Sequence, residues 1–301
     1  MKVAIYYHRV DWDGIFSALI AREFLEKKGL SVELEGWTYG DEVPGVTDIL
    51  GKYSSIYMVD ISFPSEVMLG LHESSRVTWI DHHQTSIKDS ELSGYSKMAG
   101  LRRDGLAACE LTWEYLHPGK ECPMIIQYLG AYDVWSKDRF LWDDLVLPLQ
   151  YGLKSEYNLS VKKVWEDWKD LMSDSDLLDY LIDQGKGILN WLSGASKSWV
   201  KIYGIPVTVA GKYKAIALLT PLFGSISFES VLEEYDLYIT LNIREGTHVI
   251  GLYAEPDRLP EFSAGEYLKM ICLPGAGGHR AAAGGTLSKE KFLEVLYEGK
   301  L

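Results

Sequence analysis

Cysteines and long apolar runs are both scarce in this sequence. Its 301 residues include three cysteines, Cys109, Cys122 and Cys272. Three is too few, and an odd number, for a disulfide framework, which favours a reducing cytoplasmic location. No uninterrupted apolar run is long enough to span a bilayer, and residues 1–7 are too short a stretch for a signal peptide. We therefore expect a cytoplasmic protein that does not associate with membranes.

Basic residues are also few. Lysine and arginine number 30 against 43 aspartates and glutamates, which gives a formal net charge of −13. A protein that holds long nucleic acid electrostatically needs a basic track, so this composition argues against long duplex partners. Short phosphorylated substrates stay open, because bound divalent cations can reverse the sign of a local acidic site.

The pattern of apolar residues predicts an α/β first half. Apolar segments of strand length alternate there with segments of helical spacing, which is typical of a mostly parallel sheet with flanking helices. The predicted strands are residues 2–7, 31–38, 55–60 and 76–80, and the predicted helices are residues 14–25, 65–71, 105–116 and 123–129. Asp104 is the expected N-cap of the third helix.

The second half predicts a connector followed by a smaller α+β domain. Apolar residues recur with helical spacing between positions 177 and 192, which predicts one or two connecting helices interrupted near Gly185 and Gly187. The later predicted strands are residues 205–210, 215–220, 237–243 and 249–254, before the Gly-rich residues 274–285 and a short helix from Lys289. A chain of 301 residues is long enough to form two cores, and we place the boundary near residue 198.

Four clusters of Asp and His, most of them at strand ends, are the main chemical feature. In an open parallel sheet, ligands collect at the carboxyl ends of the strands. The residues expected to converge there are His8, Asp11, Asp13, Asp60, Asp81, His82 and His83, while Asp133 follows a predicted helix. Crowded carboxylates repel one another unless a cation neutralises them. A mixed Asp/His set suits two ions such as Mn²⁺, whereas Mg²⁺ prefers more oxygen ligands and Zn²⁺ usually recruits cysteine.

Each cluster taken alone also fits a structural role. Residues 11–14 could be a turn and helix cap, Asp60 a strand-end cap, and the adjacent His82 and His83 a surface pair. Their joint occurrence favours a metal centre. Two ions roughly 3.5–4 Å apart would generate a hydroxide nucleophile and clamp the attacking and leaving oxygens.

The order of these motifs resembles the Asp-His-His (DHH) phosphoesterase superfamily. Asp81-His82-His83 stands between the earlier His8, Asp11, Asp13 and Asp60 and the later Asp133. Residues 277–284, Gly-Gly-His-Arg-Ala-Ala-Ala-Gly, look like the substrate-binding signature of the DHH-associated second domain. The superfamily includes single-strand exonucleases, oligoribonucleases, cyclic-dinucleotide phosphodiesterases, pyrophosphatases and exopolyphosphatases. The motifs span residues 8 to 284, nearly the whole chain.

The resemblance implies roles for these residues. It makes residues 1–198 the metal-binding catalytic domain with its helical connector, and residues 199–301 the substrate-binding domain. One ion would be held by His8, Asp11 and Asp60, and the other by Asp13, Asp60, His82 and Asp133, with Asp60 bridging. Asp81 and His83 would be the catalytic residues, Asp81 orienting its neighbours and His83 contacting substrate phosphate. Gly277, Gly278, His279 and Arg280 would bind substrate.

Other residues extend the predicted substrate site. Residues 275–278 precede an apparent helix, whose N-terminus would cradle phosphate. Arg102 and Arg103 would reach substrate phosphate, or would form a solvated or ion-paired surface couple. Trp12 and Trp135, beside the predicted ligands, are candidates for stacking on a base.

The expected function is therefore a divalent-metal-dependent phosphoesterase. It would hold two Mn²⁺ per chain, with Mg²⁺ or Co²⁺ as alternatives, and would hydrolyse short single-stranded oligonucleotides or phosphorylated nucleotides with metal-activated water. The alternatives within the superfamily are a pyrophosphatase or exopolyphosphatase and a single-strand exonuclease. A non-catalytic nucleotide-binding scaffold is disfavoured by the complete metal set. The sequence does not indicate an oligomeric state.

Overall fold

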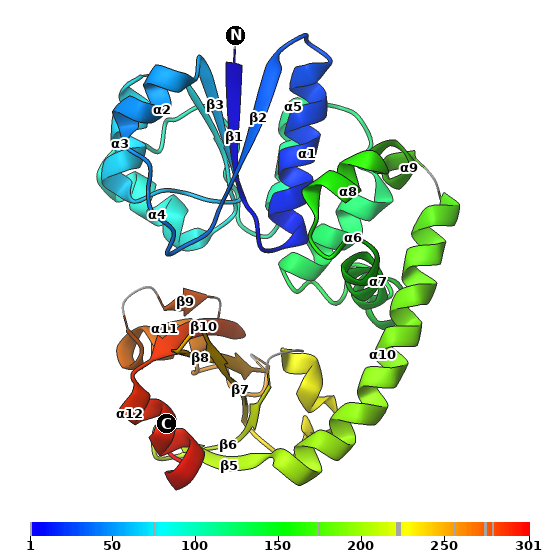
Figure 1. Cartoon of the computed structure of the whole chain (residues 1–301), viewed down its shortest axis with the longest axis vertical. Coiled ribbons are helices and arrows are strands. Elements are labelled where there is room, and N and C mark those ends of the chain that lie inside the picture. Colours follow the sequence, from blue (N-terminus) through cyan, green and yellow to red (C-terminus); the bar gives the residue numbers. More distant parts are fainter. Residues whose placement is uncertain are drawn as a thin grey trace. The chain divides into compact units, whose positions relative to one another are not determined.

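The chain divides into two compact units, Met1–Ile188 and Leu189–Leu301 (Figure 1). The computed structural model describes residues 2–74, 76–173, 175–220, 224–255, 257–273, 276–278 and 280–301, without the side chain of residue 229. The division and the predicted boundary near residue 198 both fall within one helix, α10 (Ser175–Tyr203).

A four-stranded parallel sheet forms the middle of the first unit. Its strands are β1 (Lys2–His8), β2 (Ser31–Trp37), β3 (Ser55–Val59) and β4 (Val77–Ile80), in the order β2-β1-β3-β4. In the parallel register, Tyr7 lies beside Val59 and Val59 beside Ile80. The carboxyl ends of β1, β3 and β4 therefore meet at one edge. Residues that follow these three strands begin side by side.

Helices cover both faces of this sheet, which completes the predicted α/β architecture (Figure 1). The helical elements that precede the connector are α1 (Trp12–Glu26), α2 (Val46–Lys52), α3 (Ser65–Glu73), α4 (Gln84–Ser93), α5 (Ala108–Leu116), α6 (Met124–Asp133), the π-helical turn η1 (Trp142–Val146), α7 (Leu147–Tyr157), α8 (Val161–Glu166) and α9 (Trp168–Ser173). Alternate residues of β1 enter different cores. Ile5 packs with α1, α5 and α6, and Tyr6 with α2 and α3. Burial on both faces is the usual state of a parallel sheet.

The connector α10 is one helix of 29 residues, so the interruption expected near Gly185 and Gly187 is wrong. A Cβ at Gly185 would lie 1.8 Å from the carbonyl oxygen of Pro148, and one at Gly152 of α7 would lie 1.9 Å from that of Leu181. These two glycines allow the backbones of α7 and α10 to touch. Close packing, and not a helix break, accounts for Gly185.

The helix predicted from residue 105 begins later, at Ala108, and Asp104 is not its N-cap. The Asp104 carboxylate instead accepts hydrogen bonds from Gln84 Nε2 at 2.6 Å and from the backbone N–H of Gly105 at 2.9 Å. The group that caps α5 lies far away in the sequence, and it belongs to the candidate metal centre.

The second unit is an α+β arrangement around a mixed six-stranded sheet. Its strands are β5 (Ile205–Val209), β6 (Tyr213–Leu219), β7 (Leu237–Arg244), β8 (Thr247–Ala254), β9 (Gly277–Gly278) and β10 (Ala282–Leu287), in the order β5-β6-β7-β8-β10-β9. Among the described strands of this sheet, β6 and β7 pair in parallel, and the other neighbouring strands pair antiparallel. The helical elements are η2 (Ser225–Val231, a 3₁₀ helix), α11 (Ala264–Ile271), α12 (Lys289–Leu293) and the π-helical turn η3 (Glu294–Glu298).

Alternation along β7 builds a core on each face of this sheet. Ile239 packs with Leu268 of α11 and Phe292 of α12, whereas its neighbour Tyr238 packs with Phe228 of η2. Among the described residues, no helix combines the length and the apolar character that crossing a bilayer requires.

The helix expected directly after residues 275–278 is not formed. Gly277–Gly278 is a short strand paired with β10, so residues 282–287 continue the sheet. Gly278 has a φ of 143°, and a Cβ there would lie 2.6 Å from the carbonyl oxygen of Ala282. The close approach requires glycine at this turn. The predicted phosphate cradle at a helix N-terminus is therefore wrong for this segment.

Candidate metal centre

Asp60, at the carboxyl end of β3, lies at the centre of the Asp/His cluster. Its residue surface is 1% exposed, and its φ of 61° is a left-handed conformation that Asp tolerates better than most residues. Oδ1 is buried and has no hydrogen-bond partner among the described residues. Leaving such an acceptor unsatisfied costs about 1–3 kcal/mol, and more when it is charged. Burial, with the charges of Asp13 and Asp11, raises the pKa of Asp60 well above its usual range.

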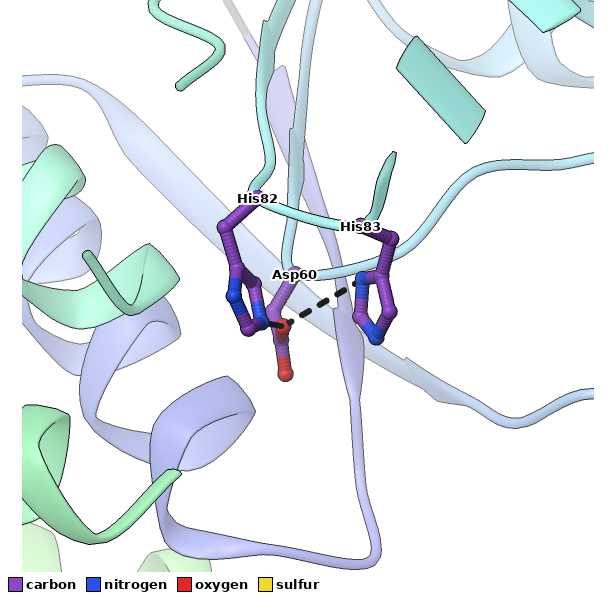
Figure 2. Close-up of side chains that lie close together, drawn as sticks. All are labelled: Asp60, His82 and His83. Carbon is purple, nitrogen blue, oxygen red and sulfur yellow. Dashed lines mark ion pairs between the residues drawn. The ribbon is translucent and has the colours of Figure 1, made fainter. Parts of the chain in front are cut away.

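The imidazoles of His82 and His83 flank this carboxylate (Figure 2). His82 Nε2 lies 3.4 Å from Asp60 Oδ1, and His83 Nδ1 lies 3.9 Å from the same oxygen. His82 Nε2 is also 3.6 Å from Asp13 Oδ2 and 3.2 Å from Asp133 Oδ2. Burial lowers the pKa of His82, but the Asp13 and Asp133 carboxylates outweigh it and raise the pKa overall.

The second oxygen of Asp60 faces a different histidine. Asp60 Oδ2 lies 3.7 Å from His8 Nδ1, which also lies 2.5 Å from Asp11 Oδ2. His8 Nε2 is 3.2 Å from Thr38 Oγ1. Burial lowers the pKa of His8, but hydrogen bonds to the two carboxylates raise it to about 10. Asp60 thus presents one oxygen to each side of the cluster.

Among the residues that the structure describes, three groups of side chains have ligand atoms within 4.8 Å of one another. They are Asp60, His82 and His83; His8, Asp11 and Asp60; and Asp13, His82 and Asp133. All six predicted metal ligands belong to at least one group, and Asp60 and His82 each belong to two. The orphaned buried oxygen and the mixed N/O donor set fit a divalent cation. That these residues hold ions stays a prediction.

Asp13 faces the cluster and also caps α5. Its Oδ2 accepts a hydrogen bond from the backbone N–H of Ala108 at 2.9 Å, and its Oδ1 accepts one from Cys109 at 2.6 Å. A carboxylate at a helix N-terminus satisfies unpaired N–H groups and interacts favourably with the helix dipole. The cap that the sequence assigned to Asp104 therefore comes from a buried residue far earlier in the chain.

Asp81 is fully buried, and both of its oxygens are hydrogen-bonded. Oδ1 accepts from the backbone N–H groups of His82 at 2.8 Å and His83 at 3.1 Å, and from His83 Nδ1 at 2.7 Å. Oδ2 accepts from Trp79 Nε1 at 3.2 Å. Burial raises the pKa of Asp81, but the His83 charge and these bonds outweigh it and leave the pKa lowered. This is the geometry of a residue that orients its two neighbours.

A partly buried ion pair that has no signal in the sequence ties α5 to the segment after Asp133. Arg139 donates to Glu110 through two nitrogens, at 2.6 and 3.1 Å, and Glu110 also accepts from the backbone N–H of Ala107 at 3.3 Å. A Cβ at Gly130 of α6 would lie 2.2 Å from Glu110 Oε2. Nothing in the sequence links positions 110 and 139, because the pairing depends on how α5 and α6 pack.

Tyr39 is another neighbour that the sequence did not indicate. Its ring packs edge-on against His8, with centroids 5.9 Å apart, and against His83 at 6.3 Å. Burial raises the pKa of its hydroxyl to about 12. No periodic or motif signal marks this residue, which lies in the loop after β2.

The predicted arginines make protein contacts. The Arg102 guanidinium donates to four backbone carbonyls, among them those of Trp79 at 2.6 Å and Met98 at 2.5 Å. Arg103 pairs with Glu114 at 2.5 Å on the surface. These contacts match the structural alternative, and contact with substrate stays a prediction for both.

The remaining candidates lie in the core or in the second unit. Trp12 is only 6% exposed and packs in the core, so it offers no ring face to a base. Gly277 and Gly278 form β9, and Arg280 donates to the carbonyls of Phe262, at 3.3 Å, and Pro260. His279 lies outside the described residues.

Comparison with solved structures identifies the fold. No protein-family model matches the chain, and neither does any curated protein. The DHH domain of PF0399, a member of a family of ribosomal proteins, superposes with a TM-score of 0.60 at 13% identity, covering 99% of this chain and 86% of that one. This chain has the DHH fold. The resemblance predicted from the motifs is confirmed at that level.

Two further DHH-fold structures are similar. PggH from Vibrio cholerae, a pGpG-specific phosphodiesterase, gives a TM-score of 0.52 at 12% identity. The superposition covers 99% of this chain and 97% of the PggH chain. RecJ from Thermus thermophilus, in complex with Mn²⁺, gives 0.51 at 16% identity and covers 97% of this chain. The present chain spans half the length of that RecJ chain.

Proposed function

We propose that this DHH-fold chain is a divalent-metal-dependent phosphoesterase acting on short oligonucleotides or phosphorylated nucleotides. The observation that carries the proposal is the position of Asp60. It is a buried carboxylate in a left-handed conformation, shared by two ligand groups, with Oδ1 between His82 and His83 and Oδ2 toward His8. A residue so placed is suited to bridging two cations.

In this proposal His8, Asp11 and Asp60 hold one ion, and Asp13, Asp60, His82 and Asp133 hold the other. Ions bound there would activate water and would neutralise the charge that develops on phosphoryl oxygens. Asp81 accepts a hydrogen bond from Nδ1 of His83 at 2.7 Å and so fixes the orientation of this ring toward substrate phosphate. Asp13 is held in place by two backbone N–H groups of α5.

Manganese is the proposed metal, with Mg²⁺ and Co²⁺ as alternatives. Oxygen and imidazole donors supply every ligand group, and none of the three cysteines belongs to one. Burial, with the neighbouring Asp13 carboxylate, raises the pKa of Cys109, which disfavours the thiolate that Zn²⁺ would need. RecJ, which shares the fold, is known in complex with Mn²⁺.

The substrate class is proposed from charge and from a neighbour of the same fold. PggH, which the chain covers almost entirely, is a pGpG-specific phosphodiesterase. A net charge of −13 disfavours long nucleic acid and is compatible with a small phosphorylated substrate at a cation centre. The small number of cysteines supports a cytoplasmic location.

The test is a hydrolysis panel on protein stripped with EDTA and reloaded with Mn²⁺. The panel contains dinucleotides, longer oligomers, 3′-phosphoadenosine 5′-phosphate, cyclic dinucleotides, pyrophosphate and polyphosphate. We expect metal-dependent turnover of the short nucleotides and a bound-metal ratio near two. Asp60→Asn should abolish turnover, while Asp89→Asn, an exposed carboxylate of α4 outside every ligand group, should not. A metal ratio near zero, with no turnover under any divalent ion, would refute the proposal. Turnover confined to pyrophosphate or polyphosphate would reassign the substrate.

A further inference from the structure

Trp135 occupies a backbone position at which helices ordinarily carry glycine. Helix α6 ends at Asp133, Val134 is its C-cap, and Trp135 follows with a φ of 55°. The backbone N–H of Trp135 bonds to the carbonyl of Tyr132 at 3.1 Å, and that of Ser136 bonds to the carbonyl of Ala131 at 2.8 Å. These two bonds define a Schellman motif, whose left-handed residue is usually glycine because a Cβ is penalised there. A bulky side chain held in this conformation points to a function for the side chain.

The indole of Trp135 is the exposed member of an aromatic cluster formed by Tyr132, Trp135 and Trp142. Trp135 is 41% exposed. Its ring lies edge-on to Trp142, with centroids 4.9 Å apart, and to Tyr132 at 5.8 Å, while Tyr132 and Trp142 stack on each other at an interplanar angle of 11°. The two half-buried rings hold the exposed one in a fixed orientation.

A cation accompanies this cluster. Lys137 Nζ lies 5.0 Å from the ring centroid of Trp135 and 5.9 Å from that of Trp142. Lys137 is exposed, so its ammonium can also meet a phosphate that arrives from solvent. An aromatic face with an adjacent cation is the combination that single-stranded nucleic-acid sites use, one part for the base and the other for the backbone.

The aromatic cluster adjoins the candidate metal centre through the chain itself. Trp135 is two residues from Asp133, so their Cα atoms are at most about 7.6 Å apart. The Asp133 carboxylate reaches His82, with Oδ2 3.2 Å from Nε2. The indole is therefore carried by the segment that directly follows a predicted ligand of the centre.

We propose that Trp135, backed by Trp142 and Tyr132, is a stacking surface for a nucleobase of the substrate. The proposal rests on the proposed phosphoesterase function and narrows it, because an inorganic phosphate chain has no group that would use an indole face. Stacking is tolerant of base identity, since every base has a π-face. Trp135 therefore selects nucleotides as a class, without selecting one base.

The experiment compares pApA, a 5′-phosphorylated dinucleotide, with its abasic analogue in Mn²⁺, using the full chain. Trp135→Gly places the preferred residue in the left-handed position, so its melting temperature should not fall below that of the wild type. We expect the ratio of kcat/KM for pApA to that for the abasic analogue to drop about tenfold, a change of ~1.4 kcal/mol, mainly through KM. Trp135→Phe should keep most of the ratio, because it retains an aromatic face.

Trp191→Ala is the matched control. Trp191, on α10, is 61% exposed and belongs neither to a ligand group nor to the aromatic cluster, so its loss should leave the ratio unchanged. An unchanged ratio in Trp135→Gly, with wild-type turnover intact, would overturn the stacking proposal and leave the phosphoesterase proposal standing. A lower melting temperature with an unchanged ratio would assign the indole a packing role instead.

Binding measured by calorimetry separates the two proposals when turnover is absent. A wild-type chain that hydrolyses nothing refutes the phosphoesterase function. In that case, weaker pApA binding in Trp135→Gly, by about tenfold, would still support the stacking surface. Equal affinity of the two chains for pApA, or no binding to either, would overturn it.

Discussion

Asp60 and Asp81 are both buried carboxylates of the candidate metal centre, but they differ in their hydrogen bonds. Asp60 Oδ1 has no partner among the described residues, whereas both oxygens of Asp81 accept hydrogen bonds. The same substitution, Asp to Asn, should therefore have opposite effects on stability at the two positions when no metal is present.

In the metal-free protein, Asp60→Asn costs no hydrogen bond at Oδ1, which has no partner among the described residues. The substitution also removes the charge repulsion between Asp60 and the carboxylates of Asp13 and Asp11. Asn also tolerates the left-handed backbone at φ 61°. We expect its melting temperature in EDTA to equal or exceed that of the wild type. Asp81→Asn turns an amide N–H₂ toward groups that are themselves donors. The loss of at least one charge-assisted bond costs roughly 1.5–3 kcal/mol, or about 3–12 °C for a unit of 150–250 residues.

Added Mn²⁺ should raise the melting temperature of the wild type above that of Asp60→Asn. An ion at a hundred times its Kd stabilises the folded state by about 2.7 kcal/mol, which corresponds to roughly 5–11 °C in melting temperature. The wild type should show this shift on going from EDTA to Mn²⁺. Asp60→Asn should show at most part of it, because both ligand groups that include Asp60 are damaged and only the group of Asp13, His82 and Asp133 stays intact. Asp81→Asn should keep much of the shift, since Asp81 belongs to neither group.

The assay is differential scanning calorimetry of the three chains in EDTA and in Mn²⁺, with metal content determined on the same samples. If Asp60→Asn loses stability in EDTA as Asp81→Asn does, Asp60 is a structural residue. If Asp60→Asn keeps the full metal shift, the assignment of Asp60 as a shared ligand is wrong.

Three further predictions follow from features of the first unit. Burial lowers the pKa of His8, but hydrogen bonds to Asp11 and Asp60 raise it to about 10, so His8 of the metal-free centre carries a proton at pH 7 that a bound metal would displace, and metal affinity should rise with pH. The calorimetric enthalpy of Mn²⁺ binding should therefore differ between Tris and Pipes, whose ionisation enthalpies differ, and equal values would contradict this. Gly187→Ala should stabilise α10 by up to about 1 kcal/mol, whereas Gly185→Ala should destabilise the folded protein by roughly 1–3 kcal/mol, because its Cβ would meet the carbonyl of Pro148. Equal melting temperatures for the two variants would refute the close packing of α7 and α10. Glu110→Gln, which breaks the partly buried pair with Arg139, should lower the free energy of unfolding measured by urea titration by about 1.5–3 kcal/mol. Glu166→Gln, which breaks the exposed pair with Lys162, should lower it by ~0–1 kcal/mol, and similar values for the two variants would show that the Glu110 pair contributes little.

Local pattern was sufficient to predict the first sheet and the strand-end part of the centre. Residues such as Asp60 and Asp81 follow short apolar runs directly, so a parallel register alone brings them to one edge. Asp133 was predicted only from the motif resemblance, because its approach to His82 depends on how α6 packs against the sheet.

The features that the sequence did not predict all depend on tertiary contact. The true cap of α5 is Asp13, and no local window contains both. In the sequence, Gly185 is typical of a helix break, whereas in the structure it leaves room for the carbonyl of Pro148. Gly277 and Gly278 likewise suggest a loop before a helix, whereas pairing with β10 draws them into a strand. In each case a partner distant in sequence decides between two local structures.

The double engagement of Asp13 bears on how related chains should be interpreted. A related protein that no longer binds metal would still need this carboxylate to cap the N-terminus of α5, so we expect it to retain Asp13 even without activity. Asp60 has no such second duty through Oδ1, which lacks a protein partner among the described residues. An aspartate at position 13 is therefore compatible with an inactive protein of the same fold. The residue at position 60 is the one that distinguishes a metal-binding relative from an inactive one.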